Sequence, residues 1–310
     1  MRSHSSSPVV AIVGAGRVGC ALGRLLHAKG WRIGPVITRS MRTARAAQRR
    51  IGGGEPRSGL SEAVLAADLI LIATPDRAIA ETAESLARLA GQRSGSTGAT
   101  GTAKEISKKP WRGKIVLHTS GALGSDVLKL LALRGAAVGS LHPLQTFSGR
   151  SVPSLAGSIC AIEGSAAALR MARRLCRKLG GVPVVLPQRR KAAYHAAAAL
   201  AAGHVLAVIE AAVRILVSVG FARKQAVRAL LPLTRQTLAN YESAGARVAW
   251  TGPLSRGDFG VIKRHLEALR HFPREYGEAY ATLSRLGVNV LANGNGSKKR
   301  QLEQTLVRVK

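Results

Sequence analysis

The sequence predicts an α/β protein in which a parallel β-sheet with crossover helices is followed by an all-helical domain. Short β-branched runs alternate with helical patterns through the first half of the chain, which is typical of a parallel sheet. No strand pattern occurs after Pro187. The length of 310 residues also indicates two domains, since domains usually contain about 100–200 residues.

Each expected element follows from its local pattern. The strands are apolar and β-branched, at 9–13, 32–38, 68–73, 114–119, 138–141, 158–162 and 182–186. Helical periodicity follows them at 17–29, 42–50, 76–89, 125–133 and 166–179, and again beyond the sheet at 188–218, 222–243, 258–270 and 273–286.

The domain boundaries follow from changes in composition. We expect a disordered start at 1–7, an α/β domain at 8–188, an all-helical domain at 189–292 and a basic flexible tail at 293–310. The Gly/Ser/Thr-rich segment 91–113 has no apolar periodicity and is expected to be a mobile insertion.

The chain is strongly basic, with 47 Lys plus Arg against 16 Asp plus Glu and a formal net charge of +31. Residues 1–190 carry 29 basic and 9 acidic residues, a net +20, and residues 191–310 carry 18 and 7, a net +11. Nucleic-acid binders usually concentrate their charge on a face or tail, and aromatic stacking platforms are poorly supplied at 4%. The even spread predicts no specific nucleic-acid partner.

The cysteines and the hydropathy pattern indicate a soluble cytoplasmic protein. Three widely spaced cysteines exclude a disulfide framework and a Cys-based zinc site, and no metal site is expected. The N-terminus lacks the apolar core of a signal peptide. The uncharged stretch 192–209 lies at the lower edge of transmembrane length, but it is mostly alanine and contains His195 and His204. We expect it to be a long buried helix and not a membrane span.

A glycine motif follows the first expected strand and opens the first expected helix. It reads Gly14-Ala15-Gly16-Arg17-Val18-Gly19. In a dinucleotide-binding Rossmann site, the first glycine permits the tight turn, the second lets the backbone approach a pyrophosphate, and the third permits close helix–strand packing. The helix N-terminus then faces the phosphates. The alternative is a glycine turn that binds nothing, and the strand–motif–helix order favours the dinucleotide.

The end of the second strand predicts NADP in preference to NAD. An NAD site has Asp or Glu there, about 20 residues past the glycines, to bind the ribose 2′-hydroxyl. Here the segment contains no acid and carries Thr38, Arg39, Ser40 and Arg42. The two guanidinium groups can bind a 2′-phosphate, with the hydroxyls assisting. The alternative is that these arginines only reflect the general arginine excess.

Polar residues follow three further strands, and ligands of open α/β sheets bind beyond the carboxyl ends of strands. Thr74 and Pro75 are expected near the nicotinamide ribose. His118, Ser120 and His142 end the next two strands, and a histidine there can serve as an acid or base. A histidine at a strand end is otherwise usually structural.

The first long helix of the second domain offers another pair of candidates. Lys191 and His195 are four residues apart and share one helix face, which would suit proton transfer to a substrate reduced by hydride. The alternative is a solvated lysine and a core histidine. Arg256 lies in a later loop and could bind an anion, whereas Asp258 is better explained as a helix N-cap.

Six segments in this order carry a family resemblance: GAGRVG, IATPDRAI, VLHTSGAL, GSLHPLQTF, KAAYHAAAALAAG and TGPLSRGD. Over residues 8–288 the chain resembles the Rossmann-like proteins whose second half is the domain of unknown function 2520. LHPLQTF and TGPLSRGD are more specific than the glycine motif. The resemblance implies a Rossmann-like domain followed by a helical domain similar to the C-terminal domain of 6-phosphogluconate dehydrogenase.

The architecture also resembles pyrroline-5-carboxylate reductases, prephenate dehydrogenases and 3-hydroxyacid dehydrogenases. Likeness to prephenate dehydrogenases implies that Ser120 and His142 contact substrate and act in catalysis. Likeness to 3-hydroxyacid dehydrogenases implies a catalytic role for Lys191, although His195 stands where those enzymes have Asn. Gly203 also stands where many members of the family have Asn, which leaves a non-catalytic function open.

The sequence leaves open three functions from different classes. The first is an NADP-dependent oxidoreductase of a small carbonyl, imine or hydroxy-acid substrate, with its site between the two domains and a partner subunit completing it. The second is a non-catalytic NADP-binding sensor or scaffold. The third, suggested only by the charge, is a nucleic-acid-associated protein. The alanine-rich helix predicts a homodimer, because small side chains let helices pack closely.

Overall fold

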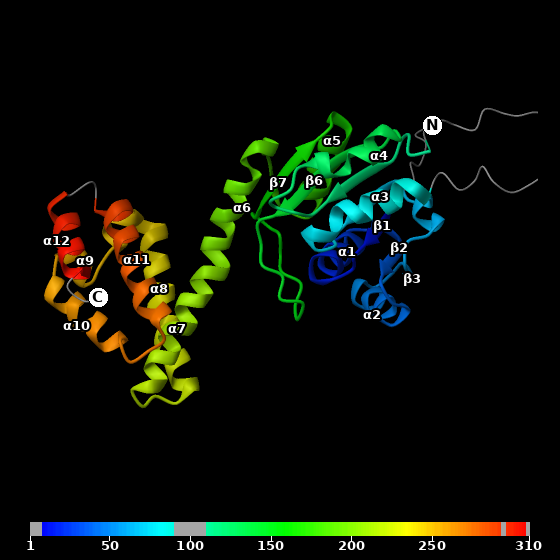
Figure 1. Cartoon of the computed structure of the whole chain (residues 1–310). Coiled ribbons are helices and arrows are strands. Elements are labelled where there is room, and N and C mark those ends of the chain that lie inside the picture. Colours follow the sequence, from blue (N-terminus) through cyan, green and yellow to red (C-terminus); the bar gives the residue numbers. More distant parts are fainter. Residues whose placement is uncertain (1–7, 90–109, 293–295, 308–310) are drawn as a thin grey trace, which may run out of the picture. The chain divides into compact units, whose positions relative to one another are not determined.

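The computed structural model describes residues 8–89, 110–292 and 296–307, whose helices and strands are drawn in Figure 1. The chain divides into two compact units, Met1–Ala202 and Gly203–Lys310. The first holds the β-sheet and the second is helical, so the fold class is α/β with a helical C-terminal region. The disordered start expected at 1–7 lies outside the described residues.

The first unit is built on one sheet of eight strands in the order β3-β2-β1-β4-β5-β6-β7-β8. The strands are β1 (Val9–Val13), β2 (Arg32–Thr38), β3 (Glu55–Ser58), β4 (Leu69–Ile72), β5 (Ile115–His118), β6 (Ala137–Pro143), β7 (Ile159–Gly164) and β8 (Val182–Val185).

Two strands differ from the sequence prediction. β7 runs antiparallel to β6, whereas the prediction was a wholly parallel sheet. No helix lies between β6 and β7, and a parallel pair needs a crossover connection, usually helical. β3 was missed because its sequence, EPRS, has no apolar alternation; its backbone nevertheless pairs with β2 at the edge of the sheet.

Helices cover both faces of the sheet. They are α1 (Arg17–Ala28), α2 (Met41–Ile51), α3 (Ile79–Leu89), α4 (Lys129–Leu133) and α5 (Ala166–Lys178), and α6 (Lys191–Ala199) follows β8. β4 shows the period of two expected of a strand with two buried faces. Leu69 and Leu71 join the core under α1, α2 and α5, while Ile70 and Ile72 join the core under α3 and α4.

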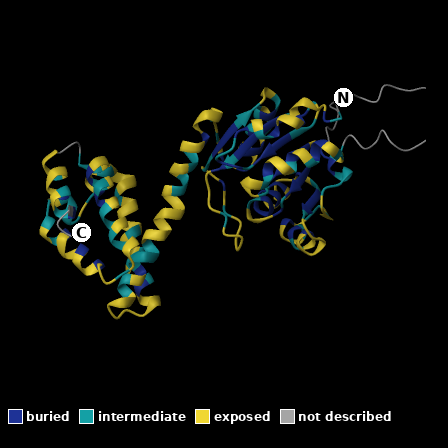
Figure 2. Ribbon diagram, in the orientation of Figure 1, coloured by how far each residue is buried: buried dark blue, intermediate teal, exposed yellow. Residues whose placement is uncertain are grey.

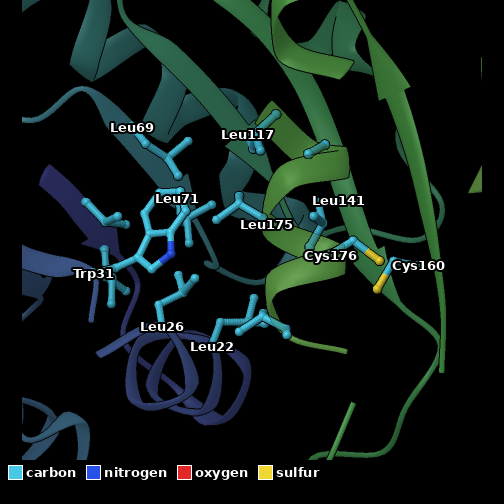
Figure 3. Close-up of a cluster of buried hydrophobic side chains, with 14 of the residues drawn as sticks. Leu22, Leu26, Trp31, Leu69, Leu71, Leu117, Leu141, Cys160, Leu175 and Cys176 are labelled. Atoms are coloured by element: carbon cyan, nitrogen blue, oxygen red, sulfur yellow. The ribbon is translucent and has the colours of Figure 1, made fainter. Parts of the chain in front are cut away.

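Figure 3 shows the first of these cores, in which Leu22 and Leu26 of α1 lie beside Trp31. The thiols of Cys160 and Cys176 project into the same core from β7 and α5. Both cysteines are buried and free, and burial raises the pKa of each thiol. They therefore act here as small apolar side chains.

The prediction of a mobile insertion at 91–113 is wrong for its last four residues, 110–113. Residues 91–109 lie outside the described part of the chain. Residues 110–113 form a turn before β5, and the Trp111 side chain is fully buried in the core under α3. A single large apolar residue thus anchors the end of a segment whose composition predicts only a mobile loop.

The second unit contains α7 (Val205–Ser218), α8 (Arg223–Ala249), α9 (Pro253–Arg256), α10 (Phe259–Leu269), α11 (Arg274–Leu291) and α12 (Gly296–Val307). α12 overturns the flexible tail predicted at 293–310 as far as it is described. Leu302 and Leu306, four apart on one helix face, are buried against Ile262, Leu266 and Val288. The basic residues around them obscure this short apolar pattern.

The helical pattern at 188–218 is also corrected. A π-helical turn, Leu200–His204, separates α6 from α7. Among the described residues, Gln188–Ser218 is long and apolar enough to cross a membrane by length and composition alone, a test that core helices of soluble proteins also pass. The prediction was a buried helix, yet only 6% of its most apolar window is buried, and Figure 2 shows much of it exposed.

The boundary between the two units lies later than the predicted end of the first domain at residue 188. α6 belongs to the sheet-containing unit. Two hydrogen bonds explain why: the Lys191 ammonium donates to the Ser120 carbonyl oxygen, and the Tyr194 hydroxyl bonds to the His142 ring. These tertiary bonds are not visible in the change of composition on which the prediction rested.

Candidate functional site

The β1–α1 turn is closely packed at two of its three motif glycines. Gly14 has φ +84°, and a Cβ there would lie 2.6 Å from the Thr74 backbone nitrogen. A Cβ on Gly19 would lie 2.6 Å from the Gly14 carbonyl oxygen. A Cβ on Gly16 would meet nothing within 4 Å. The turn is therefore closed toward the protein and open at Gly16, as close approach of a pyrophosphate requires.

The N-terminus of α1 is free to receive an anion. No side chain caps it, and its first turn contains no acid and includes Arg17 and Val18. Beside it, the Thr74 hydroxyl is buried and has no hydrogen-bond partner among the residues that the structure describes. Free backbone N–H groups and the positive end of the helix dipole stabilise phosphate. These residues fit the phosphates of a dinucleotide.

The end of β2 leads into the first turn of α2 through a hydroxyl network. The Thr43 backbone N–H donates to the Ser40 hydroxyl, which makes Ser40 the N-cap of α2. Thr38 donates to the Ser40 carbonyl oxygen over 2.8 Å. Arg39 and Arg42 flank this cap, and both are exposed. The segment presents two guanidinium groups and no carboxylate beside a second helix N-terminus.

Two strand ends are joined through Asp76 and Ser120. Pro75 precedes a short 3-10 helix that begins at Asp76. The Ser120 hydroxyl donates to the Asp76 carboxylate over 2.8 Å, and accepts from the backbone N–H groups of Ala122 and Leu123. Ser120 is 4% exposed. It holds the turn after β5, and its hydroxyl already makes three hydrogen bonds.

His118 is a structural histidine held in one neutral tautomer. The Ser120 backbone N–H donates to its Nδ1 over 3.2 Å, so the proton belongs on Nε2, which donates to the Gly124 carbonyl oxygen over 3.1 Å. The side chain is fully buried. Burial, and next the charge of Lys191, lower the pKa of His118 to about 4. Both ring nitrogens make hydrogen bonds within the protein, so His118 has a structural role.

The end of β6 meets the first turns of α6. His142 Nδ1 lies 3.0 Å from the Tyr194 hydroxyl oxygen, and the two rings pack edge to face. The ring of His195 lies 5.6 Å from that of His142. On its other side, His142 Nε2 lies so close to Gly121 that a Cβ there would approach it to 2.8 Å. Burial, then His195 and Lys191, lower the pKa of His142 to about 4.

Lys191 points into the protein and not toward solvent. It is 1% exposed, and its ammonium donates to the Ser120 carbonyl oxygen over 3.1 Å and to the Ser140 hydroxyl over 2.6 Å. Ser140 donates in turn to Glu163, whose carboxylate also accepts from Ser125. Burial lowers the pKa of Lys191 to about 8, against the opposing charge of Glu163.

Four predicted catalytic residues thus lie near one another: Ser120 and Lys191 are joined by a hydrogen bond, His142 and His195 by a ring contact, and the charge of Lys191 acts on His142. Arg256 lies in the second unit and pairs with Asp258. Among the described residues, no group of three or more His, Cys, Asp or Glu could hold a metal ion. Sequence reasoning missed several members of the cluster, namely Gly121, Ser140, Glu163 and Tyr194. Only Tyr194 carried a signal, since it stands between Lys191 and His195 on the same helix.

Family models match most of the chain in two parts. The model of a Rossmann-like domain matches residues 4–104, and that of a domain of unknown function, DUF2520, matches residues 158–286. The chain joins a Rossmann-like domain to a DUF2520 domain. The DUF2520 match begins beside β7 and ends within α11. It therefore includes Lys191, Tyr194 and His195, whereas the β1–α1 turn lies in the Rossmann-like part.

Solved structures with the same fold include several oxidoreductases. A protein of Bacteroides fragilis, provisionally described as an NADP oxidoreductase, is 22% identical with a TM-score of 0.71, and the match covers 90% of this chain and 97% of that one. A reductive aminase of Aspergillus terreus, solved with NADPH and ethyl-5-oxohexanoate, is 17% identical with a TM-score of 0.61, covering 91% and 94%.

An imine reductase of Myxococcus stipitatus, solved with NADP+, is 18% identical with a TM-score of 0.61, and the match covers 97% of this chain and 99% of that one. At these identities, the similarity shows the fold alone, and it extends over both the Rossmann-like and the DUF2520 parts. No curated protein matches the chain.

Proposed function

We propose that the protein is an NADP-dependent oxidoreductase acting on a small carbonyl, imine or hydroxy-acid substrate. The observation that carries the proposal is the β1–α1 turn, which is packed at Gly14 and Gly19 and open at Gly16. An acid-free β2 end with two exposed arginines supports the choice of NADP. Structures of similar fold include a reductive aminase with NADPH and an imine reductase with NADP+.

The residues of the first unit divide into a cofactor end and a substrate end. The N–H groups at the start of α1 would bind the pyrophosphate, and Arg39 and Arg42 would bind the 2′-phosphate. When bound, NADPH would supply a hydride to the substrate. Thr74 and Pro75 would border the ribose beside the nicotinamide. The substrate would lie at the cluster that contains Ser120, His142, Lys191 and His195.

Cofactor preference is the first test of this proposal. We expect NADPH to bind at least about tenfold more tightly than NADH, which corresponds to about 1.4 kcal/mol, because a charge-assisted phosphate contact contributes about 1.5–3 kcal/mol. Titration of the purified protein with each cofactor, followed by fluorescence, measures the ratio.

The control for this titration lies on α2, the helix that follows Arg39. Arg39→Ala should remove the preference, whereas Arg49→Ala, an exposed arginine in the last turn of α2, should keep it. Equal affinity of the parent protein for NADPH and NADH would contradict the assignment of the 2′-phosphate site. A screen of small ketones, imines and hydroxy acids on the NADPH-binding protein then tests turnover.

A non-catalytic NADP-binding sensor or scaffold is the second candidate function. It is favoured by the fact that the Ser120 hydroxyl and the Lys191 ammonium are already bound to other groups of the protein. Tight NADPH binding with no turnover in the substrate screen would promote this function over the oxidoreductase.

A nucleic-acid-associated function is the third candidate. α5 gathers basic side chains around one shallow surface depression, at Arg170, Arg173, Arg174, Arg177 and Lys178. Phosphate contacts release counterions, so binding through such charges weakens as salt rises. We expect weak binding to any DNA that disappears at moderate salt. Binding that persists there or discriminates between sequences would favour this function.

We further propose a cytoplasmic homodimer. The support is the exposed apolar surface of α7 and α8, to which Leu206, Leu233, Leu238 and Val248 each contribute a side chain more than half exposed. Monomeric proteins rarely expose large contiguous apolar patches. The three buried free cysteines suit a reducing compartment.

A further inference from the structure

Carbonyl reduction requires a proton donor as well as a hydride, and three donors meet in the cluster. Lys191, His142 and Tyr194 are joined by the start of α6 and the ends of β5 and β6. A catalytic acid must reach the substrate atom that receives its proton, so geometry decides before pKa does. This inference rests on the oxidoreductase function proposed above.

The Lys191 ammonium is not placed to reach a substrate. Its ammonium is directed at the Ser120 carbonyl oxygen and the Ser140 hydroxyl, and the side chain is 1% exposed. Beyond Ser140 lies the Glu163 carboxylate, which supplies a counter-charge. Releasing the ammonium to a substrate would leave these buried acceptors without their donor, which is unfavourable for buried polar groups.

His142 is enclosed on both sides of its ring. Nδ1 is bound to the Tyr194 hydroxyl at 3.0 Å, and Nε2 faces the Gly121 backbone too closely for a methyl group to fit between them. Its pKa of about 4 leaves the ring neutral at pH 7. His142 can therefore orient Tyr194, but it lacks a spare proton that faces open space.

Of these three donors, Tyr194 remains. It lies on α6 facing the end of β6, it is only partly buried, and its hydroxyl is hydrogen-bonded to His142. We propose that Tyr194 is the catalytic acid and that His142 is its positioning residue, donating a hydrogen bond from Nδ1–H to the phenol oxygen. Lys191 then ties the start of α6, which carries Tyr194, to β6, which carries His142.

The proton balance of this step is simple. The substrate carbon gains the hydride supplied by the reduced nicotinamide, and the Tyr194 O–H bond breaks as its proton forms a new O–H bond on the former carbonyl oxygen. The His142 N–H bond stays intact and stabilises the phenolate. The phenolate then recovers a proton from water, which restores the starting state.

The acidity of the phenol is adequate for this role. Burial raises the pKa of Tyr194 to about 12, which is still below the pKa of water. The alkoxide that hydride transfer would form on the substrate is about as basic as hydroxide, so it would take the phenol proton readily. Because the phenol stays protonated throughout the physiological range, the acid is present whenever the substrate binds.

The first experiment examines the pair without cofactor or substrate. In ¹⁵N-histidine-labelled protein, the His142 signals, assigned with His142→Asn, should show a protonated Nδ1, and Tyr194→Phe should shift them. The second unit offers a matched control, because His265 Nδ1 lies 2.8 Å from the Tyr280 hydroxyl in the same edge-to-face geometry. Tyr280→Phe should move only the His265 signals. An unprotonated Nδ1 on His142 would overturn the proposed hydrogen bond.

The second experiment measures turnover with a ketone found in the substrate screen. Tyr194→Phe should lower kcat by about 10²–10⁴, the usual contribution of general acid catalysis, while NADPH affinity and Tyr280→Phe turnover stay at parent values. If the parent reduces the ketone and Tyr194→Phe does so at the same rate, this inference alone falls. If the parent reduces none of the screened substrates, the proposed function falls and the inference with it.

A third comparison separates positioning from proton transfer by His142. His142→Asn keeps an N–H donor near the position of Nδ1 but cannot act as an acid, whereas His142→Leu removes the donor. The expected result is that His142→Asn retains most of kcat and His142→Leu loses at least about tenfold, with KM little changed in both. Equal losses in the two variants would show that the imidazole proton itself is used, and would overturn the assignment.

Discussion

At the scale of single residues, the site depends on polar groups whose protonation is set by their hydrogen bonds. His118 shows this most clearly, because its two ring nitrogens accept from Ser120 and donate to Gly124. A second ring proton would face the Ser120 N–H. Burial, and next the charge of Lys191, lower the pKa of His118 to about 4.

This pKa predicts a loss of stability in mild acid. Because the folded-state pKa is depressed, the unfolded chain takes up a proton below about pH 6.5 that the folded protein refuses until about pH 4. The free energy of unfolding should fall through that window by up to about 3 kcal/mol from His118. Urea unfolding at pH 7 and pH 4.5 measures the difference.

The matched variants for this measurement are His118→Gln and His271→Gln. The glutamine at 118 keeps a donor for the Gly124 carbonyl oxygen but cannot titrate, so the pH dependence should become smaller. His271 is exposed, and its replacement should leave the pH dependence unchanged. A full parent-like dependence in His118→Gln would show that the acid sensitivity arises elsewhere.

At the scale of elements, substitutions in the β1–α1 turn should affect cofactor binding and folding separately. Gly16→Val should abolish NADPH binding while leaving the melting temperature nearly unchanged, because Gly16 has φ −79° and its side-chain position is empty to 4 Å. Gly19→Val should destabilise the fold itself, because its Cβ would meet the Gly14 carbonyl oxygen. Thermal unfolding and NADPH titration of both variants check the contrast, and normal NADPH binding by Gly16→Val would argue against a dinucleotide at this turn.

Helices, strands and turns differ in how well the sequence alone predicts them. Strands β1 and β2 and the glycine turn were predictable because local apolar runs and turn residues determine them. The direction of β7 and the burial of Trp111 depend on tertiary packing, which periodicity does not record. The candidate site followed the same rule: strand ends located Ser120 and His142, but the pairing of His142 with Tyr194 joins residues that are 52 apart in sequence.

At the scale of the whole molecule, the exposed apolar surface of the second unit predicts self-association. Val205, Leu206 and Val208 on α7 are 41%, 66% and 47% exposed. In a twofold symmetric dimer each such residue occurs twice in the interface. Burying one leucine contributes about 1.5–3 kcal/mol, so Leu206→Asp should weaken the dimer by at least about two orders of magnitude.

Sedimentation equilibrium tests this directly. The parent should have twice the 32.5 kDa mass of one chain at micromolar concentration, and Leu206→Asp should shift toward the single-chain mass. Leu133→Asp is the control, because Leu133 on α4 is 74% exposed but belongs to the first unit, outside the apolar surface of α7 and α8. A parent protein that sediments as a single chain at these concentrations would rule out the homodimer, and α7 would then need another partner to cover it.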